Sequence, residues 1–128
     1  MLTGAMLACT SARDRTRLMT TAPDGDMYGL IGRMTAIPGQ RDALAEILLA
    51  GTATMPGCLS YIVAADSADA DALWITEVWD SAESHRASLH LPEVRAAIAR
   101  GRPLIAGFDS RVETAPIGGH GLHRENRS

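Results

Sequence analysis

The stretch "LWITEVWDSAESH", residues 73–85, gives the clearest indication of the fold. Successive side chains of a strand point to opposite faces, so one face would carry Leu73, Ile75, Glu77 and Trp79. Ser81 is a typical residue at the start of a helix, and Glu83 would place a carboxylate in the first turn. The stretch predicts a strand that runs directly into a helix, with the Glu77 carboxylate turned toward the core beside an indole.

Turn signals on either side of this stretch divide the rest of the chain into strands and helices. Strands are predicted over residues 27–37, 58–66, 73–80 and 108–115, and helices over residues 41–55 and 81–101, the second divided by Pro92. In the last strand, Phe108, Ser110 and Val112 are expected to share one face. The order β-α-β-β-α-β predicts a ferredoxin-like α+β fold, in which two helices cover one face of a four-stranded antiparallel sheet. The bare face predicts a homodimer.

The length of 128 residues allows one domain. We expect residues 1–26 to be a disordered extension, residues 27–114 to form the domain, and residues 115–128 to be an irregular tail. A net charge of -3 and a pI near 5.7 give no basic surface for nucleic acid. No apolar run approaches the roughly 20 residues of a membrane span. The two cysteines, Cys9 and Cys58, fit a reducing cytoplasm.

Glu77 allows a structural and a functional interpretation. An unpaired carboxylate on a buried face costs several kcal/mol, so Glu77 could form an ion pair with Arg33 or Arg111. Burial also raises the pKa of a carboxyl group toward the range used in acid-base catalysis. The same open choice applies to Trp79, which is either a core residue or, with Met34, Tyr61 and His85, the wall of a pocket for a planar aromatic molecule.

The sequence offers little for metal or cofactor binding. His85 and His90 are five residues apart, whereas ligands on one helical face lie three or four apart. The pair "HGLH" at residues 120–123 lies in the glycine-rich tail. No glycine pattern for a nucleotide follows a strand, so we expect neither a metal nor an organic cofactor.

Three segments together resemble the antibiotic biosynthesis monooxygenase domain family, which includes quinol monooxygenases. They are "MPGCLSYIVAAD" (55–66), "WITEVWDSAESH" (74–85) and "LPEVRAAIARGRPLIAGF" (91–108). The resemblance implies a dimeric α+β barrel with a pocket between each sheet and its helices. It implies cofactor-independent oxidation of quinol or polyphenol-type aromatic substrates by O2. Trp79 would then hold the ring, and Glu77 or His85 would transfer its proton, with Arg33, Met34 and Tyr61 as further substrate-binding candidates.

The chain departs from this family at three positions. Polyketide-tailoring members carry asparagine where Ile75 stands, and the haem-degrading branch carries histidine and asparagine where we align Ile98 and Gly32. Haem degradation is therefore disfavoured. Two alternatives stay open beside the monooxygenase: a non-oxidative isomerase of the same fold, and a non-catalytic dimer that binds small molecules in a stress response. A fold alone does not choose among them.

Overall fold

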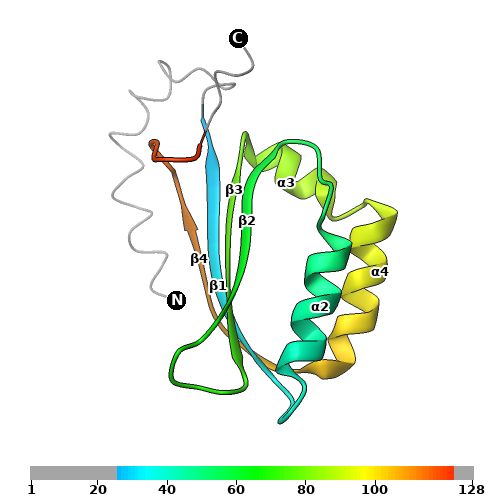
Figure 1. The fold of residues 1–128 in the computed structure, drawn as a ribbon. Helices are drawn as coiled ribbons and strands as arrows, with labels where there is room; N and C mark the ends of the chain where they lie inside the picture. Colours follow the sequence, from blue (N-terminus) through cyan, green and yellow to red (C-terminus); the bar gives the residue numbers. More distant parts are fainter. Residues whose placement is uncertain (1–25, 123–128) are drawn as a thin grey trace, which may run out of the picture.

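The structure is a computed structural model that describes residues 26–122, and these residues form the predicted series of strands and helices (Figure 1). The elements are β1 (Tyr28–Ala36), α2 (Arg41–Gly51), β2 (Cys58–Ala65), β3 (Ala72–Trp79), α3 (Ala82–Ser88), α4 (Pro92–Gly101), the 3-10 turn η2 (Arg102–Leu104) and β4 (Ile105–Thr114). The disorder predicted for residues 1–26 concerns a segment that lies, apart from Asp26, outside the described residues. Residues 123–128 of the predicted irregular tail also lie outside the described residues. No described helix has the length and apolar character needed to cross a bilayer.

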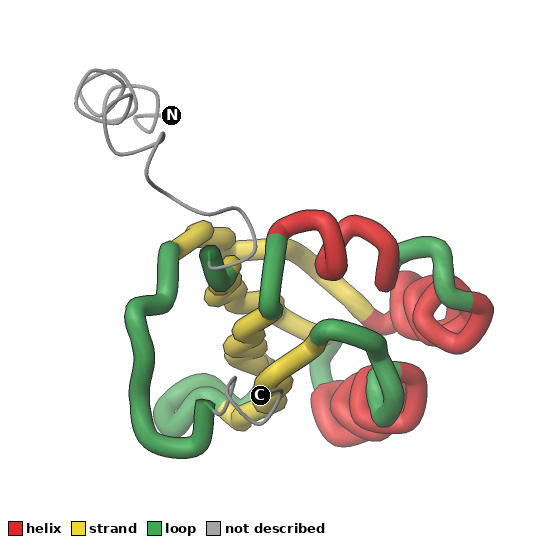
Figure 2. Tube along the Cα trace, turned by 90° about the horizontal axis from the view of Figure 1, so that it is seen from above, coloured by secondary structure: helices red, strands yellow, loops and turns green. Residues whose placement is uncertain are grey.

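The four strands form one antiparallel sheet in the order β2-β3-β1-β4. Figures 1 and 2 show all the helices on one side of this sheet. The predicted ferredoxin-like fold is therefore confirmed. The strand register sets Glu77 of β3 between Leu30 of β1 and Tyr61 of β2, so these three side chains share the helix-facing side of the sheet.

The core lies between this side of the sheet and the helices, in two clusters. The first consists of Ala36, Leu44, Leu73 and Ile75, and the second of Met55, Trp79 and Val94. Leu73, Ile75 and Trp79 alternate along β3, so the period of the strand brings all three to the helices. The same period brings Glu77, which stands between Ile75 and Trp79 on that face.

Local sequence signals explain how β3 leads into the helices. The Ser81 hydroxyl accepts a hydrogen bond from the Ser84 backbone N–H at 3.0 Å and thereby caps α3. Pro92 begins α4, where its missing N–H leaves no helical hydrogen bond unmade. The predicted helix over residues 81–101 is thus two helices, and the break falls at Pro92 as predicted.

The prediction for the faces of the last strand is wrong. The β1–β4 register shifts between Arg33 and Met34, so that Ser110 lies opposite Arg33 while Phe108 lies opposite Met34. A bulge of this kind re-aims the side chains on one side of it. Phe108 is therefore on the helix-facing side with Met34, whereas Ser110 and Val112 face the other way.

Gly57 and Gly39 provide a matched test of the turn before β2. Both have positive φ, 86° and 84°, but a Cβ on Gly57 would lie 2.5 Å from the Ser84 hydroxyl oxygen, while a Cβ on Gly39 would meet nothing within 4 Å. We expect Gly39→Ala to lower the free energy of unfolding by about 1 kcal/mol through backbone strain. Gly57→Ala should cost about 1–3 kcal/mol more, because Ser84 must move. Equal losses in urea denaturation would contradict this packing.

Candidate active site

Glu77 and Trp79 are joined directly on the helix-facing side of β3. The Trp79 indole N–H donates a hydrogen bond of 2.9 Å to the Glu77 carboxylate, and the Trp79 side chain is only 1% exposed. The two residues are two positions apart in a strand, so they point the same way. This hydrogen bond offsets part of the free energy lost when the Glu77 carboxylate is removed from water.

His85 approaches the same carboxylate from α3. Its Nε2 lies 3.9 Å from Glu77 Oε1, and both side chains are largely buried. The Ser81 cap sets the start of α3, and the His85 backbone N–H bonds to the Ser81 carbonyl, so His85 stands one turn into the helix. The imidazole and the carboxylate are therefore held by neighbouring elements. At this distance one substrate oxygen can lie within hydrogen-bond reach of both groups.

Burial governs the charge of Glu77. Desolvation raises the pKa of Glu77 above its ordinary value, and the Trp79 hydrogen bond and the charges of His85 and Arg111 oppose this rise. Of the two arginines considered as partners, Arg111 is thus the one whose charge reaches Glu77. The ion-pair partner of Arg111 among the described residues is Glu113, whose carboxylate lies 3.7 Å from the Arg111 guanidinium.

Tyr61 adds a phenol beside the carboxylate. It is the cross-strand partner of Glu77, and burial together with the nearby Glu77 charge raises the pKa of Tyr61 well above its ordinary value of 10.0. Tyr61 therefore keeps its proton at physiological pH and can act as a hydrogen-bond donor.

These side chains line a partly open space, here called the inner cavity, of about 170 Å³. It lies between the sheet and the helices, with Tyr61, Glu77, Trp79 and His85 on one side and apolar residues of α2 and α4, among them Leu48 and Ile98, on the other. A concave, mostly apolar pocket with a few convergent polar groups is the usual form of a small-molecule site. The structure thus brings together four of the six residues predicted for the site.

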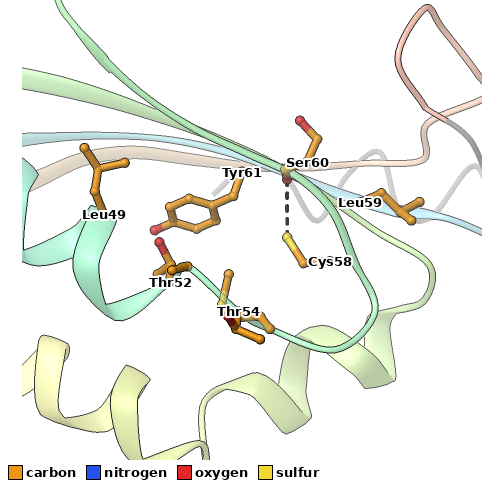
Figure 3. Close-up of a pocket in the computed structure, with 9 residues that line it drawn as sticks. Leu49, Thr52, Thr54, Cys58, Leu59, Ser60 and Tyr61 are labelled. Carbon is orange, nitrogen blue, oxygen red and sulfur yellow. Dashed lines mark hydrogen bonds between the residues drawn. The ribbon is translucent and has the colours of Figure 1, made fainter.

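A second hollow of about 530 Å³, here called the outer hollow, adjoins the inner cavity between α2 and β2 (Figure 3). Thr52, Met55 and Tyr61 line both spaces. Figure 3 shows Tyr61 extending from β2 toward α2, and the Cys58 thiol donating a 3.5 Å hydrogen bond to the Ser60 carbonyl. Tyr61 therefore stands at the boundary between the outer hollow and the buried carboxylate.

The structure does not bring Arg33 to the inner cavity. Arg33 lies on the opposite side of the sheet, where its guanidinium contacts the carboxylates of Asp109 at 2.7 Å, Asp69 at 3.2 Å and Asp66 at 3.4 Å. Strand alternation explains this, because the cross-strand partner of Arg33 is Trp74 and not a member of the Glu77 face. Arg33 is thus neither the partner of Glu77 nor a residue of this pocket.

Met34 is on the helix-facing side but does not line the inner cavity. It packs against the Leu44 and Leu73 cluster, several residues along β1 from Leu30, the neighbour of Glu77. Its distance along the strand, and not its face, separates it from the site.

Tyr28 is a neighbour of this site that the sequence did not reveal, since it contacts His85 but does not line the inner cavity. Its ring lies 5.1 Å from that of His85, whose other neighbour is the Trp79 ring at 5.5 Å, edge-on. The Tyr28 hydroxyl donates a 2.6 Å hydrogen bond to Glu113. Tyr28 is the cross-strand partner of Trp79, so the strand register, which no local pattern encodes, places it here.

The raised pKa of Glu77 makes stability depend on pH. The folded protein keeps the proton of the Glu77 carboxyl group at pH values where the unfolded chain has already released it. The free energy of unfolding therefore falls as the pH rises from about 4.5, the ordinary pKa of the group, through the pKa in the folded protein. Glu77→Gln removes this dependence. We expect the free energy of unfolding of Glu77→Gln, relative to wild type, to increase with pH above 4.5 and then level off. Urea denaturation across this range tests the sign.

Within residues 26–122, no three side chains of His, Cys, Asp or Glu converge in a way that could hold a metal ion.

Comparisons with known proteins agree with this architecture. The family model described as antibiotic biosynthesis monooxygenase matches residues 27–100, more than half of the chain. A crystal structure from Chloroflexus aurantiacus J-10-fl, assigned by name to antibiotic biosynthesis monooxygenases, is 68% identical, with 75% of this chain and 98% of that chain covered and a TM-score of 0.74. Among functionally curated proteins, none matches.

More distant structures share the fold alone. SnoaB, a cofactor-independent oxygenase from Streptomyces nogalater, is 15% identical with a TM-score of 0.61, over 74% of this chain and 97% of that chain. A protein of Mycobacterium tuberculosis is 24% identical with a TM-score of 0.62, over 73% and 98%. The predicted resemblance is confirmed by the family match and by the 68% identical structure, and this chain belongs to the antibiotic biosynthesis monooxygenase family.

Proposed function

We propose that this chain is a cofactor-independent monooxygenase that oxidises quinol or polyphenol-type aromatic substrates with O2. The observation that carries the proposal is the buried Glu77 carboxylate, with the Trp79 indole N–H at 2.9 Å and the His85 imidazole at 3.9 Å, on the wall of the inner cavity. A desolvated carboxylate with a raised pKa is a stronger base than one in water. Family membership supports monooxygenase chemistry in general, and the site supports a phenolic substrate in particular.

In the proposed reaction, Glu77 or His85 accepts a proton from a substrate hydroxyl while Trp79 packs on the ring. The resulting anion is electron-rich and reacts with O2 directly. One oxygen atom forms a bond to ring carbon and the other leaves as water, so a hydroquinone becomes a hydroxyquinone and the substrate supplies all four electrons. The protein contributes position and proton transfer. Tyr61, which keeps its proton, donates a hydrogen bond to the substrate oxygen.

Oxygen uptake tests the proposal. Purified protein, treated with a chelator, is assayed with benzo- and naphthohydroquinones, and autoxidation is subtracted. We expect saturable uptake with one oxygen atom of ¹⁸O2 in the product. The absence of uptake above autoxidation for every substrate would overturn the proposal. Proton exchange at a ring-adjacent carbon without O2 would instead favour an isomerase, since Glu77 and His85 can move protons without oxygen.

We also propose that the chain acts as a homodimer in the cytoplasm. On the side of the sheet without helices, the strand register sets Ile62, Thr76, Ile31 and Val112 in one row across the sheet, and Ile62 and Val112 are 53% and 52% exposed. Pairing of two such faces would bury this row. Light scattering should give twice the chain mass for wild type and the single mass for Ile62→Asp/Val112→Asp. A monomeric wild type at micromolar concentration would refute the dimer.

A further inference from the structure

The orientation of the His85 imidazole depends on the aromatic rings around it. Its Nε2 lies 3.9 Å from Glu77 Oε1, which is too long for a hydrogen bond that would fix the ring. The Trp79 ring lies 5.5 Å away, edge-on, and the Tyr28 ring lies 5.1 Å away, tilted by 35°. Both distances are within the range over which aromatic rings attract one another. The imidazole is therefore flanked by two rings of the sheet.

The main chain of His85 is fixed separately from its ring. The His85 N–H bonds to the Ser81 carbonyl at 3.3 Å, and the buried Ser88 hydroxyl donates a 2.6 Å hydrogen bond to the His85 carbonyl. These bonds set the position of the His85 backbone in α3. They leave the side-chain torsions free, and the second torsion of histidine has a broad energy profile. Packing against Tyr28 and Trp79 is what restrains that torsion.

The two flanking rings differ in their relation to the inner cavity. Trp79 lines the inner cavity and donates its N–H to Glu77, so it contacts both the pocket and the carboxylate. Tyr28 does not line the cavity and still contacts the His85 ring. A change at Tyr28 therefore acts on His85 and leaves the wall of the pocket in place.

Tyr28 is itself held by the neighbouring strand. The sheet order places β1 between β3 and β4, so Tyr28 can contact the β3–α3 connection on one side and β4 on the other. Its hydroxyl donates a 2.6 Å hydrogen bond to Glu113, whose carboxylate lies 3.7 Å from the Arg111 guanidinium. Burial and then Glu113 raise the pKa of Tyr28, so the hydroxyl keeps the proton that it donates.

We propose that Tyr28 is a positioning residue: its ring, fixed by the hydrogen bond to Glu113, holds the His85 imidazole in the orientation in which it faces Glu77. Tyr28 acts through His85 and not on the substrate. A displacement of about 1 Å in a catalytic group can lower a rate by about 10²-fold, so such a residue affects turnover from outside the pocket. This inference rests on the proposed function for the role of His85 in proton transfer.

The carbon-bound protons of the imidazole report this positioning without any turnover. A packed aromatic ring shifts their NMR signals, and the His85 signals among those of four histidines are identified by their loss in His85→Gln. We expect Tyr28→Leu, which removes the ring, to move the His85 signals toward those of the exposed His90. Tyr28→Phe keeps the ring and should keep most of the shift. Phe108→Leu, the matched change at a residue that is 75% exposed, should leave the His85 signals unchanged.

Oxygen uptake tests the consequence for the reaction. Tyr28→Leu should lower kcat by about 10- to 100-fold and keep KM within about threefold, because the pocket wall is not altered. Tyr28→Phe should restore kcat to within about threefold of wild type. In a His85→Ala background, Tyr28→Leu should have no further effect on kcat, since a residue that acts through His85 then has nothing to position. A purely structural role would lower stability without this dependence on His85.

Glu113→Ala provides a second variant in case Tyr28→Leu does not fold. The Glu113 side chain is 57% exposed, so its removal leaves the core intact and frees the Tyr28 hydroxyl. It should move the His85 signals in the same direction as Tyr28→Leu, by a smaller amount.

The outcomes separate this inference from the proposed function. His85 signals that stay unchanged in Glu113→Ala and in folded Tyr28→Leu would overturn the positioning role. So would a wild-type kcat in Tyr28→Leu, or a full further loss from Tyr28→Leu in the His85→Ala background. Shifted His85 signals, together with no oxygen uptake by wild type, would support Tyr28 as the residue that orients His85 and would remove the oxidation chemistry.

Discussion

Replacing Glu77 with glutamine is expected to lower kcat/KM for hydroquinone oxidation by about 10²- to 10⁴-fold, the usual contribution of a positioned general base. Glutamine keeps an oxygen that can accept the Trp79 N–H, so the fold and the indole position are preserved. What is lost is the ability to accept a proton. Steady-state oxygen uptake measures the loss, and calorimetric binding of a hydroquinone should change far less than turnover.

His85→Ala provides the companion measurement, because either His85 or Glu77 could be the group that accepts the proton. If His85 is the base, the loss for His85→Ala matches or exceeds that for Glu77→Gln. Two control variants change exposed residues of the same types. Glu83→Gln replaces a glutamate in α3, and His90→Ala replaces a histidine in the turn that follows α3. Activity in both site variants within about twofold of wild type would remove Glu77 and His85 from the mechanism.

Trp79→Ala is expected to lower the free energy of unfolding by about 3–5 kcal/mol, the range for a buried Phe or Trp reduced to Ala. Trp79 is a fully buried member of the cluster with Met55 and Val94 and also forms the wall of the inner cavity. Urea denaturation measures the loss. Phe108→Ala, an aromatic-to-alanine change at an exposed position, should cost less than about 1 kcal/mol.

Trp79→Phe separates the ring from the indole N–H. It keeps most of the buried area, so it should cost much less stability than Trp79→Ala. It also removes the hydrogen bond that opposes the rise in the pKa of Glu77, so the acid limb of kcat/KM should move to higher pH. An unmoved acid limb, with activity intact, would indicate that Glu77 is not the titrating base.

Local chemistry made much of the fold predictable. The alternation in "LWITEVW" predicted the helix-facing side of β3, Ser81 predicted the start of α3, and Pro92 predicted the break before α4. Each of these signals acts over a few residues, through side-chain period, capping or a missing N–H. The meeting of Glu77, Trp79 and His85 also follows locally, since all three lie within nine residues of one strand-to-helix connection.

Contacts between distant segments were decided by the tertiary structure. The register of β1 against β3 placed Tyr28 on His85 and turned Arg33 to the far side of the sheet, where three aspartates hold it. A bulge between β1 and β4 turned Phe108 toward the helices.

The order of the elements, the buried face of β3 and the carboxylate on that face could therefore be predicted from local sequence, because they depend on interactions between neighbours in the chain. Long-range packing sets which arginine charge reaches Glu77, which aromatic rings flank His85, and which residues line each hollow. A register shift of one residue reverses the face of every side chain beyond it, and no local pattern encodes that shift.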